Sequence, residues 1–159
     1  MTIEGTRSEY SEICLPNYTN MLGTMLGGHV MHLVDLCGAI AAMRHARSAV
    51  VTASVDQMTF LHPIHIGDLV RLKSQVNRVF RTSMEVGVKV WVENLKTTAI
   101  RHTSSAYLTF VALDADGNRV VLPCVEPDND EERRRYNEAA ERRAYRLAQK
   151  QKTKNSPEF

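Results

Sequence analysis

The chain has 159 residues, of which 43% are hydrophobic and 24% are charged, and its formal net charge at neutral pH is +2. This length and composition fit one domain with a substantial core, and no run of some 18 apolar residues, which a membrane-spanning helix requires, is present. The first nine residues mix charges without an apolar stretch, so we expect a cytoplasmic location with neither a signal peptide nor a membrane anchor. The three cysteines are odd in number and far apart, which predicts neither a disulfide framework nor a zinc ribbon.

A carboxylate stands inside the first predicted helix. A short strand from about Glu9 to Leu15 comes first, and the helix follows, with apolar residues on almost every face between Val30 and Met43. Such a pattern is typical of a helix that is buried rather than laid on a surface. Burying an unpaired carboxylate is costly, so we expect Asp35 to be paired, protonated or facing a cavity. Perturbed carboxylates gather at active sites, although a satisfied Asp at a helix edge is the structural alternative.

Two glycines, Gly27 and Gly28, directly precede this apolar run. They allow a tight turn and a close approach to the free N–H groups of the first helical turn, which form a site for an anion or a carbonyl. Asp35 lies about two turns further along, within reach of a carbonyl held near the start of the same helix or of a neighbouring one. His29, His32 and Asp35 spread over about 120° of the helix, a geometry that does not predict a metal site.

The chain after this helix reads as consecutive strands. In one of them Met84, Val86 and Val88 alternate with Glu85 and Lys89. A strand, a buried helix and then strands joined by tight turns predict an antiparallel sheet packed around the helix, in the α+β class. The four predicted strands are residues 49–56, 70–79, 83–94 and 99–113, and turn residues close the last one at 114–118.

Charge is concentrated near the C-terminus. Residues 1–127 carry 11 basic and 11 acidic side chains, whereas residues 128–154 carry 9 basic and 6 acidic ones. We predict a domain over 1–127, followed at 128–159 by an amphipathic helix from Asn129 to Lys150 and a frayed tail from Thr153 to Phe159. Asp130 is the expected N-cap. The clusters Arg133-Arg134-Arg135 and Arg142-Arg143 are interpreted as a solvated helix face rather than a phosphate-binding site, and no aromatic pattern or recognition motif favours nucleic-acid binding.

Several motifs, met in the same order, resemble the acyl-CoA hydrolases of the hotdog fold, a family that includes bacterial acyl-CoA thioesterases and the brain-type acyl-CoA hydrolase. The resemblance covers about residues 9 to 124, and the combination is far more specific than any single motif. One departure is Phe80, where many members carry Gly. The motifs are Asn20-x-x-Gly23-x-x-x-Gly27-Gly28, Met31-x-x-x-Asp35-x-x-Gly38-Ala39-Ile40, the segment 51–60 with Pro63 and Gly67-Asp68, and Arg81-Thr82-Ser83-Met84-Glu85-Val86.

The resemblance implies a sheet wrapped around a central helix and an assembly of several copies. Members of this family pair their sheets edge to edge into a dimer, which is commonly stacked further into tetramers or hexamers, and the acyl-CoA lies at the dimer interface. An open sheet needs cover for its edges, which agrees with dimerisation. We therefore expect a dimer that assembles as a trimer of dimers, in which Asn20 of one subunit faces Asp35 of the other.

The implied activity is hydrolysis of acyl-CoA to CoA and a carboxylic acid. Asp35 would act as a general base on water, or as a nucleophile through a mixed anhydride, and Asn20 would orient the water or stabilise the oxyanion. Coenzyme A enters as part of the substrate, and no cofactor or metal is expected. The expected oxyanion donors are the backbone N–H groups at Gly27, Gly28 and His29, and the expected contacts to the CoA phosphates are Arg81, Thr82 and Ser83.

Two other functions stay open at this point. A hotdog hydratase or dehydratase would pair an Asp with a His as acid and base, a role that His29 or His32 could fill. A non-catalytic acyl-CoA-binding regulatory module would usually carry a DNA-binding extension, and the short N-terminal arm leaves no room for a helix-turn-helix.

Overall fold

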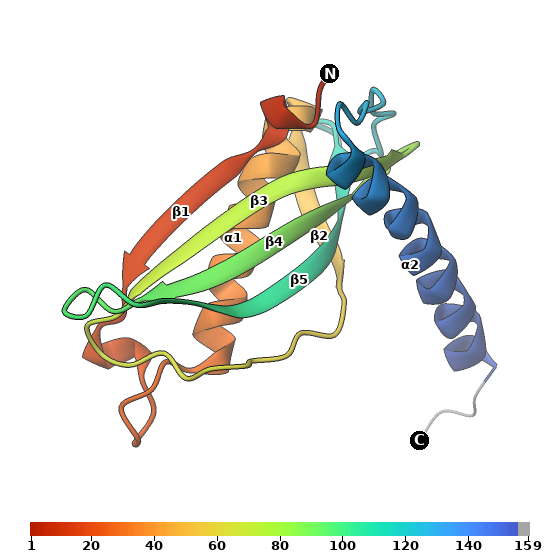
Figure 1. Ribbon diagram of the computed structural model, residues 1–159. Coiled ribbons are helices and arrows are strands. Elements are labelled where there is room, and N and C mark those ends of the chain that lie inside the picture. Colours follow the sequence, from red (N-terminus) through yellow and green to blue (C-terminus); the bar gives the residue numbers. More distant parts are fainter. Residues whose placement is uncertain (156–159) are drawn as a thin grey trace.

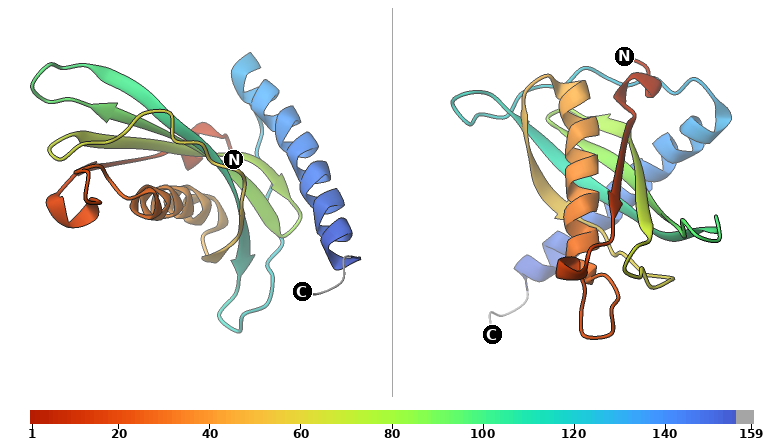
Figure 2. Two further views of the ribbon diagram at one scale, coloured as in Figure 1. Left: turned by 90° about the horizontal axis from the view of Figure 1, so that it is seen from below. Right: turned by 90° about the vertical axis from the view of Figure 1, so that its left-hand side faces the viewer.

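The protein, seen here as a computed structural model that describes residues 1–155, is built around one five-stranded antiparallel sheet with the strand order β1-β3-β4-β5-β2. The sheet curls around the long helix α1, and the second helix α2 lies against the opposite face (Figures 1 and 2). The predicted α+β architecture is confirmed. The elements are β1 (Ser8–Ile13), α1 (Gly27–Ala46), β2 (Ala49–Val55), β3 (Leu69–Phe80), β4 (Ser83–Glu93), β5 (Ile100–Leu113) and α2 (Asp130–Lys154), with short 3-10 turns at Glu4–Thr6 and Pro16–Tyr18.

Helix α1 buries one face against the sheet and leaves the other open. Gly38 permits the close packing, because a Cβ there would lie 3.2 Å from the ring of Phe110. The predicted burial on all sides is wrong: Met31, Leu36 and Met43 keep 40% or more of their surface exposed. The sheet covers only one side of the helix in a single copy of the chain (Figure 2). The buried positions of α1 are Val30, Leu33, Val34, Cys37, Gly38, Ala41, Ala42 and His45.

Strand β2 forms one edge of the sheet. Among the described residues it pairs only with β5, and a register shift between Thr52 and Ser54 marks a bulge at Ala53. Val51 and Val55 are 47% and 41% exposed on this edge. An edge strand with exposed apolar side chains is a surface that a second chain can cover.

Helix α2 crosses the face of the sheet opposite α1 (Figure 1). Its N-cap is Asn129, whose side-chain Oδ1 accepts a hydrogen bond from the Glu132 N–H at 2.9 Å, so the cap lies one residue before the predicted Asp130. The helix continues to Lys154, beyond the predicted end at Lys150. The predicted frayed tail is therefore helical over its first residues, and its last part, 156–159, lies outside the described residues.

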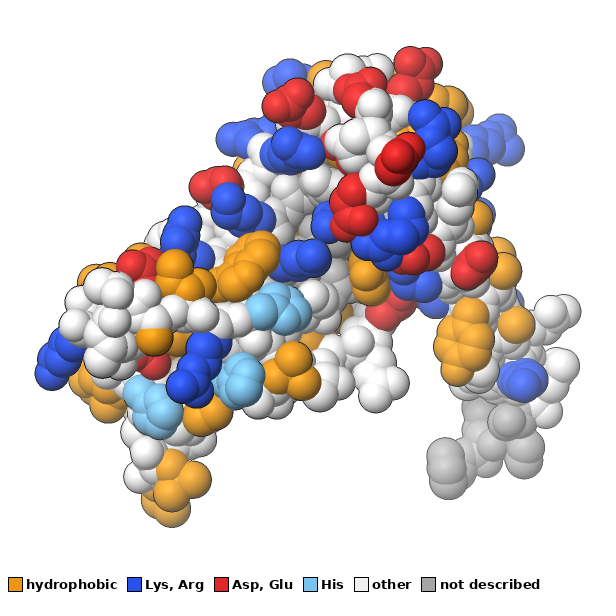
Figure 3. All heavy atoms as spheres, viewed as in Figure 1, with side chains coloured by type: hydrophobic (Ala, Val, Ile, Leu, Met, Phe, Trp, Pro, Cys, Tyr) orange, Lys and Arg blue, Asp and Glu red, His pale blue; other side chains and the backbone are white. Residues whose placement is uncertain are grey.

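The arginines of α2 are not all solvated, which corrects the interpretation of this helix as a solvated basic face. Arg142 pairs with Glu85, a fully buried carboxylate on β4, at 2.7 Å. By contrast, Arg134 is paired with carboxylates of α2 itself at exposed positions. The space-filling view shows acidic and basic side chains interspersed around the start of α2 (Figure 3). Neither helix of the described residues is long and apolar enough to span a membrane.

Candidate active site

Asp35 projects from the middle of α1 toward β2 and is half-buried. Its Oδ1 accepts a hydrogen bond from the Thr52 hydroxyl at 2.6 Å. The two residues come from elements packed side by side, and Thr52 stands directly before the bulge of β2. The bulge re-aims side chains locally, a feature that is common near active sites. Asp35 is thus held in one orientation with its second oxygen, Oδ2, left without a hydrogen bond from the described residues.

The start of α1 offers two open backbone donors. The N–H groups of His29 and Val30 both donate to the carbonyl of Leu26, at 3.0 and 3.2 Å. The predicted oxyanion role of the His29 N–H is therefore not supported by this geometry. The N–H groups of Gly27 and Gly28 have no acceptor within residues 1–155, as expected for the first positions of a helix.

Space is available beside these donors. Apart from its chain neighbours and the adjoining helix backbone, no heavy atom of residues 1–155 lies within 4 Å of the position that a Cβ of Gly28 would occupy. At the preceding residue, the ring of Phe60 comes to 3.4 Å from the corresponding position of Gly27. A carbonyl oxygen can therefore approach Gly28 from the open side, and Phe60 borders the approach.

The side chain of His29 is engaged with β1 and the preceding loop. Its Nε2 lies 3.0 Å from Glu12 Oε2, and its ring stacks on Tyr18 with 3.9 Å between the ring centres. This arrangement fixes the first turn of α1 against β1. Within the described residues, no group of three or more His, Cys, Asp and Glu side chains is arranged to hold a metal ion.

Asn20 shapes the loop that leads into α1. Its Oδ1 accepts hydrogen bonds from the N–H groups of Leu22 and Thr24, and its Nδ2 donates to the Thr24 hydroxyl at 2.9 Å. One Nδ2 hydrogen remains for another partner. The tip of this loop, Met21 and Leu22, is almost wholly exposed, and apolar side chains gather at the tip that projects below the sheet in Figure 3.

The structure joins Asp35 to Thr52 but separates Asp35 from the open donors of its own helix. Asp35 comes seven positions after Gly28, which corresponds to a rise of about 10 Å along the helix axis. A thioester carbonyl at Gly28 is therefore out of reach of Asp35 in the same chain. Thr52 was not among the predicted site residues, because only the packing of β2 on α1 reveals its contact.

Arg81, Thr82 and Ser83 lie at the hairpin between β3 and β4. Phe80 pairs with Ser83, which makes Arg81 and Thr82 the two turn residues, and Arg81 has a positive φ of 31°. The carbonyl of Arg81 accepts a hydrogen bond from the Leu122 N–H at 2.8 Å, which holds the turn in place. The Arg81 side chain is exposed, and no carboxylate of residues 1–155 pairs with it. It is a free cation on a fixed turn.

Comparison with known proteins identifies the family. A sequence model described as the thioesterase superfamily matches residues 22–99. The acyl-CoA thioester hydrolase YkhA of Bacillus subtilis is 43% identical over 127 residues, which span 80% of this chain and 74% of that protein. The chain belongs to the thioesterase superfamily. Two solved structures agree with this thioesterase over nearly its whole length, both with a TM-score of 0.90.

The first of these structures is an acyl-CoA hydrolase of Staphylococcus aureus in complex with butyryl-CoA and CoA. It is 34% identical, and the match covers 98% of this chain and 94% of that one. The second is a hexameric acyl-CoA thioesterase, 40% identical, with 94% and 96% of the two chains covered. The predicted hotdog fold of this thioesterase is thereby confirmed, and α2 is included in the matched length.

Proposed function

We propose that this thioesterase hydrolyses acyl-CoA to CoA and a carboxylic acid, with Asp35 as the reacting carboxylate. The observation that supports this role most directly is the hydrogen bond from Thr52 to Asp35, which holds a half-buried carboxylate on the open side of α1. The S. aureus hydrolase has been solved with an asparagine, an aspartate and a threonine each changed to alanine. The spacing between those three residues equals the spacing between Asn20, Asp35 and Thr52, which supports assigning these side chains to one site.

In the proposed reaction, Asp35 takes a proton from a water whose oxygen attacks the thioester carbonyl carbon. The tetrahedral intermediate collapses, the C–S bond breaks, and the proton passes to the CoA thiolate as it leaves. In the alternative, Asp35 attacks directly and water then hydrolyses the mixed anhydride. Thr52 orients the carboxylate in both routes, and each backbone N–H that stabilises the oxyanion contributes about 3 kcal/mol.

The site we propose is shared between two subunits. The rise of about 10 Å from Gly28 to Asp35 excludes one carbonyl from contacting both groups of one helix. The α1 start of a partner subunit would supply the donors of Gly27 and Gly28, and its Asn20 loop would supply the free Nδ2 hydrogen. The exposed apolar side chains of α1 and β2 on this side support a dimer interface here.

We infer further assembly of the dimers into a trimer of dimers. A hexameric thioesterase that matches 94% of this chain at a TM-score of 0.90 supports this assembly. Arg81, with Thr82 and Ser83, is our proposed contact for the CoA phosphates, because a fixed turn presents a cation and two hydroxyls there. A cytoplasmic location and the absence of a cofactor stay predictions.

Measuring the release of CoA from acyl-CoA tests the function. Release of CoA is followed with a thiol-reactive dye over a series of acyl-CoA chain lengths, for the wild type and for Asp35→Ala. We expect hydrolysis by the wild type and a loss of about 100-fold or more in Asp35→Ala, because a general base or nucleophile contributes at least that much. Asp116→Ala, in an exposed turn, is the matched control.

Two results would contradict this proposal. Near wild-type hydrolysis by a folded Asp35→Ala protein, verified by circular dichroism, would make Asp35 structural. A wild type that binds acyl-CoA without hydrolysing any member of the series would instead indicate an acyl-CoA-binding regulatory module.

A further inference from the structure

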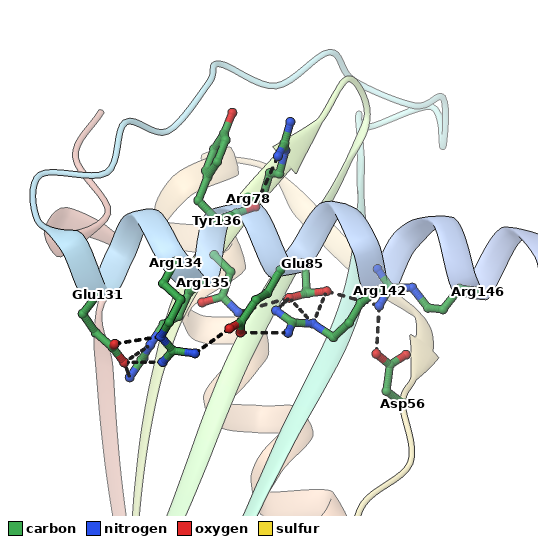
Figure 4. A network of polar contacts seen from close by, with 11 residues as sticks. Asp56, Arg78, Glu85, Glu131, Arg134, Arg135, Tyr136, Arg142 and Arg146 are labelled. Atoms are coloured by element: carbon green, nitrogen blue, oxygen red, sulfur yellow. Dashed lines mark hydrogen bonds and ion pairs between the residues drawn. The ribbon is translucent and has the colours of Figure 1, made fainter.

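Helix α2 is attached to the sheet by a buried ionic network (Figure 4). At its centre is Glu85 of β4, which has no exposed surface. The Arg142 guanidinium donates to both Glu85 oxygens, at 2.7 to 3.1 Å, and Asn77 Nδ2 donates to Glu85 Oε1 at 3.1 Å. Arg142 also lies over the ring of Tyr107, 3.7 Å from its centre. These contacts satisfy the Glu85 carboxylate and neutralise its charge.

A second arginine one turn further along α2 has a different main partner. Arg146 Nη1 lies 2.8 Å from Asp56 Oδ2 and 3.2 Å from Glu85 Oε2. Both members of the Arg146–Asp56 pair are only about one-fifth exposed, at 18% and 21%. Because Arg142 already pairs with Glu85, Arg146 supplies the charge that balances Asp56. The last turns of α2 are thus tied to Asp56 (Figure 4).

Asp56 directly follows β2 and is itself hydrogen-bonded to β5. Its N–H donates to the Tyr107 carbonyl at 2.9 Å, directly after Val55 closes the strand. Within residues 1–155, strand β2 has a pairing partner on one side only, and its ladder is interrupted by the bulge between Thr52 and Ser54. Such a strand has few hydrogen bonds of its own to resist local opening. An ion pair at its end therefore adds to the restraint that its pairing with β5 supplies.

Two groups of the proposed site lie on β2 or shortly after it. Thr52, four residues before Asp56, donates to Asp35. The segment that begins at Asp56 also carries Phe60, whose ring borders Gly27 at the start of α1. The neighbours of Phe60 are also held to β5 directly, because the Leu61 N–H donates to the Thr103 carbonyl at 2.9 Å. The ion pair between α2 and β2 therefore acts chiefly on Thr52.

We propose that Arg146 is a positioning residue for the hydrolysis, acting through Asp56 on β2 and on Thr52. This inference rests on the proposed function, because it assigns α2 a role at the same site. Arg146 lies on the opposite face of the sheet from α1 and touches none of the proposed site residues. Its effect on the reaction is therefore an effect on geometry, and a misplacement of even 1 Å at a reacting group lowers rates strongly.

The test compares Arg146→Met with Asp56→Ala, the double variant, and Arg146→Lys. We expect each single variant to lower kcat about tenfold with KM for acyl-CoA changed by less than about twofold. The double variant should be no worse than either single one, because both changes break the same pair. Arg146→Lys keeps the cation and should recover most of kcat.

Arg78→Met is the matched control. Arg78 also holds α2 to the sheet, with its guanidinium 4.1 Å from the centre of the Tyr136 ring and Nη1 donating to the Tyr136 carbonyl at 3.2 Å. It contacts the first half of α2 and not β2. We expect this variant to lower thermal stability while kcat stays within about twofold of the wild type.

Amide hydrogen exchange supplies a readout that is independent of activity. Peptides over residues 49–57 should exchange about fivefold faster or more in Arg146→Met, and at the wild-type rate in Arg78→Met. Wild-type kcat in Arg146→Met, an equal kcat loss in Arg78→Met, or additive losses in the double variant would each overturn the inference. An inactive wild type would refute the proposed function instead, and the exchange comparison would still decide whether Arg146 holds β2.

Discussion

The Thr52→Val substitution tests the contact on which the proposed site rests. Valine keeps the branched shape that suits strand β2 and removes only the hydroxyl that donates to Asp35 at 2.6 Å. A hydrogen bond to a charged group contributes about 1.5 to 3 kcal/mol, and the exposed position of Thr52 places this one near the lower end. A loss of about 1.4 kcal/mol corresponds to a tenfold change in rate. We therefore expect kcat/KM to fall about tenfold.

The assay follows the release of CoA with a thiol-reactive dye, using an acyl-CoA that saturates the enzyme. Thermal unfolding is measured in parallel. Thr109→Val on the neighbouring strand β5 is the matched control, because the Thr109 hydroxyl is buried without a hydrogen-bond partner in the described part of the chain. That change should leave kcat/KM unaltered. If Thr52→Val kept wild-type kcat/KM, or lost activity only in proportion to a loss of folded protein, the role of Thr52 in orienting Asp35 would be refuted.

Two further predictions concern the CoA contact and the response to acid. Arg81→Ala should raise KM for acyl-CoA with kcat nearly unchanged, which corresponds to a loss of about 1 to 2 kcal/mol of binding free energy. Hydrolysis of an acyl-pantetheine, which lacks the nucleotide phosphates, should stay normal. An equal defect on both substrates would exclude a phosphate contact. Burial lowers the pKa of His45, which donates from Nε2 to the Pro123 carbonyl at 2.7 Å. The unfolded chain then binds this proton more readily, so the free energy of unfolding should fall as pH drops below about 6.5, and urea titrations should show a smaller fall in His45→Gln.

The sequence predicted the elements of the fold because its local patterns agree with their final contacts. Alternation over 83–94 matches β4, and the glycine pair before the apolar run matches the start of α1 at Gly27. Burial of α1 on all sides was wrong for a physical reason: its remaining apolar face, with Met31 and Leu36, is not covered by any other part of residues 1–155 in one copy. Periodicity records that a face is apolar but not which molecule covers it.

Contacts between distant segments were beyond the reach of pattern alone. Thr52 meets Asp35 only because β2 returns beside α1, and no spacing in the sequence marks that pairing. Glu85 alternates with apolar residues of β4, a position that indicates the outer face of the sheet, yet α2 covers that face and pairs Arg142 with it. A charge on a predicted solvent face gives no sign that another segment will bury it.

The most direct test of the central claim, a hydrolytic site shared between two subunits, is complementation between Asn20→Ala and Asp35→Ala. Each variant alone should be nearly inactive. After subunits are mixed in equal amounts and mixed dimers are verified by mass spectrometry, we expect about a quarter of wild-type hydrolysis, because half of the dimers are mixed and each regains one of its two sites. Mixed dimers with no recovery of hydrolysis would contradict the shared site.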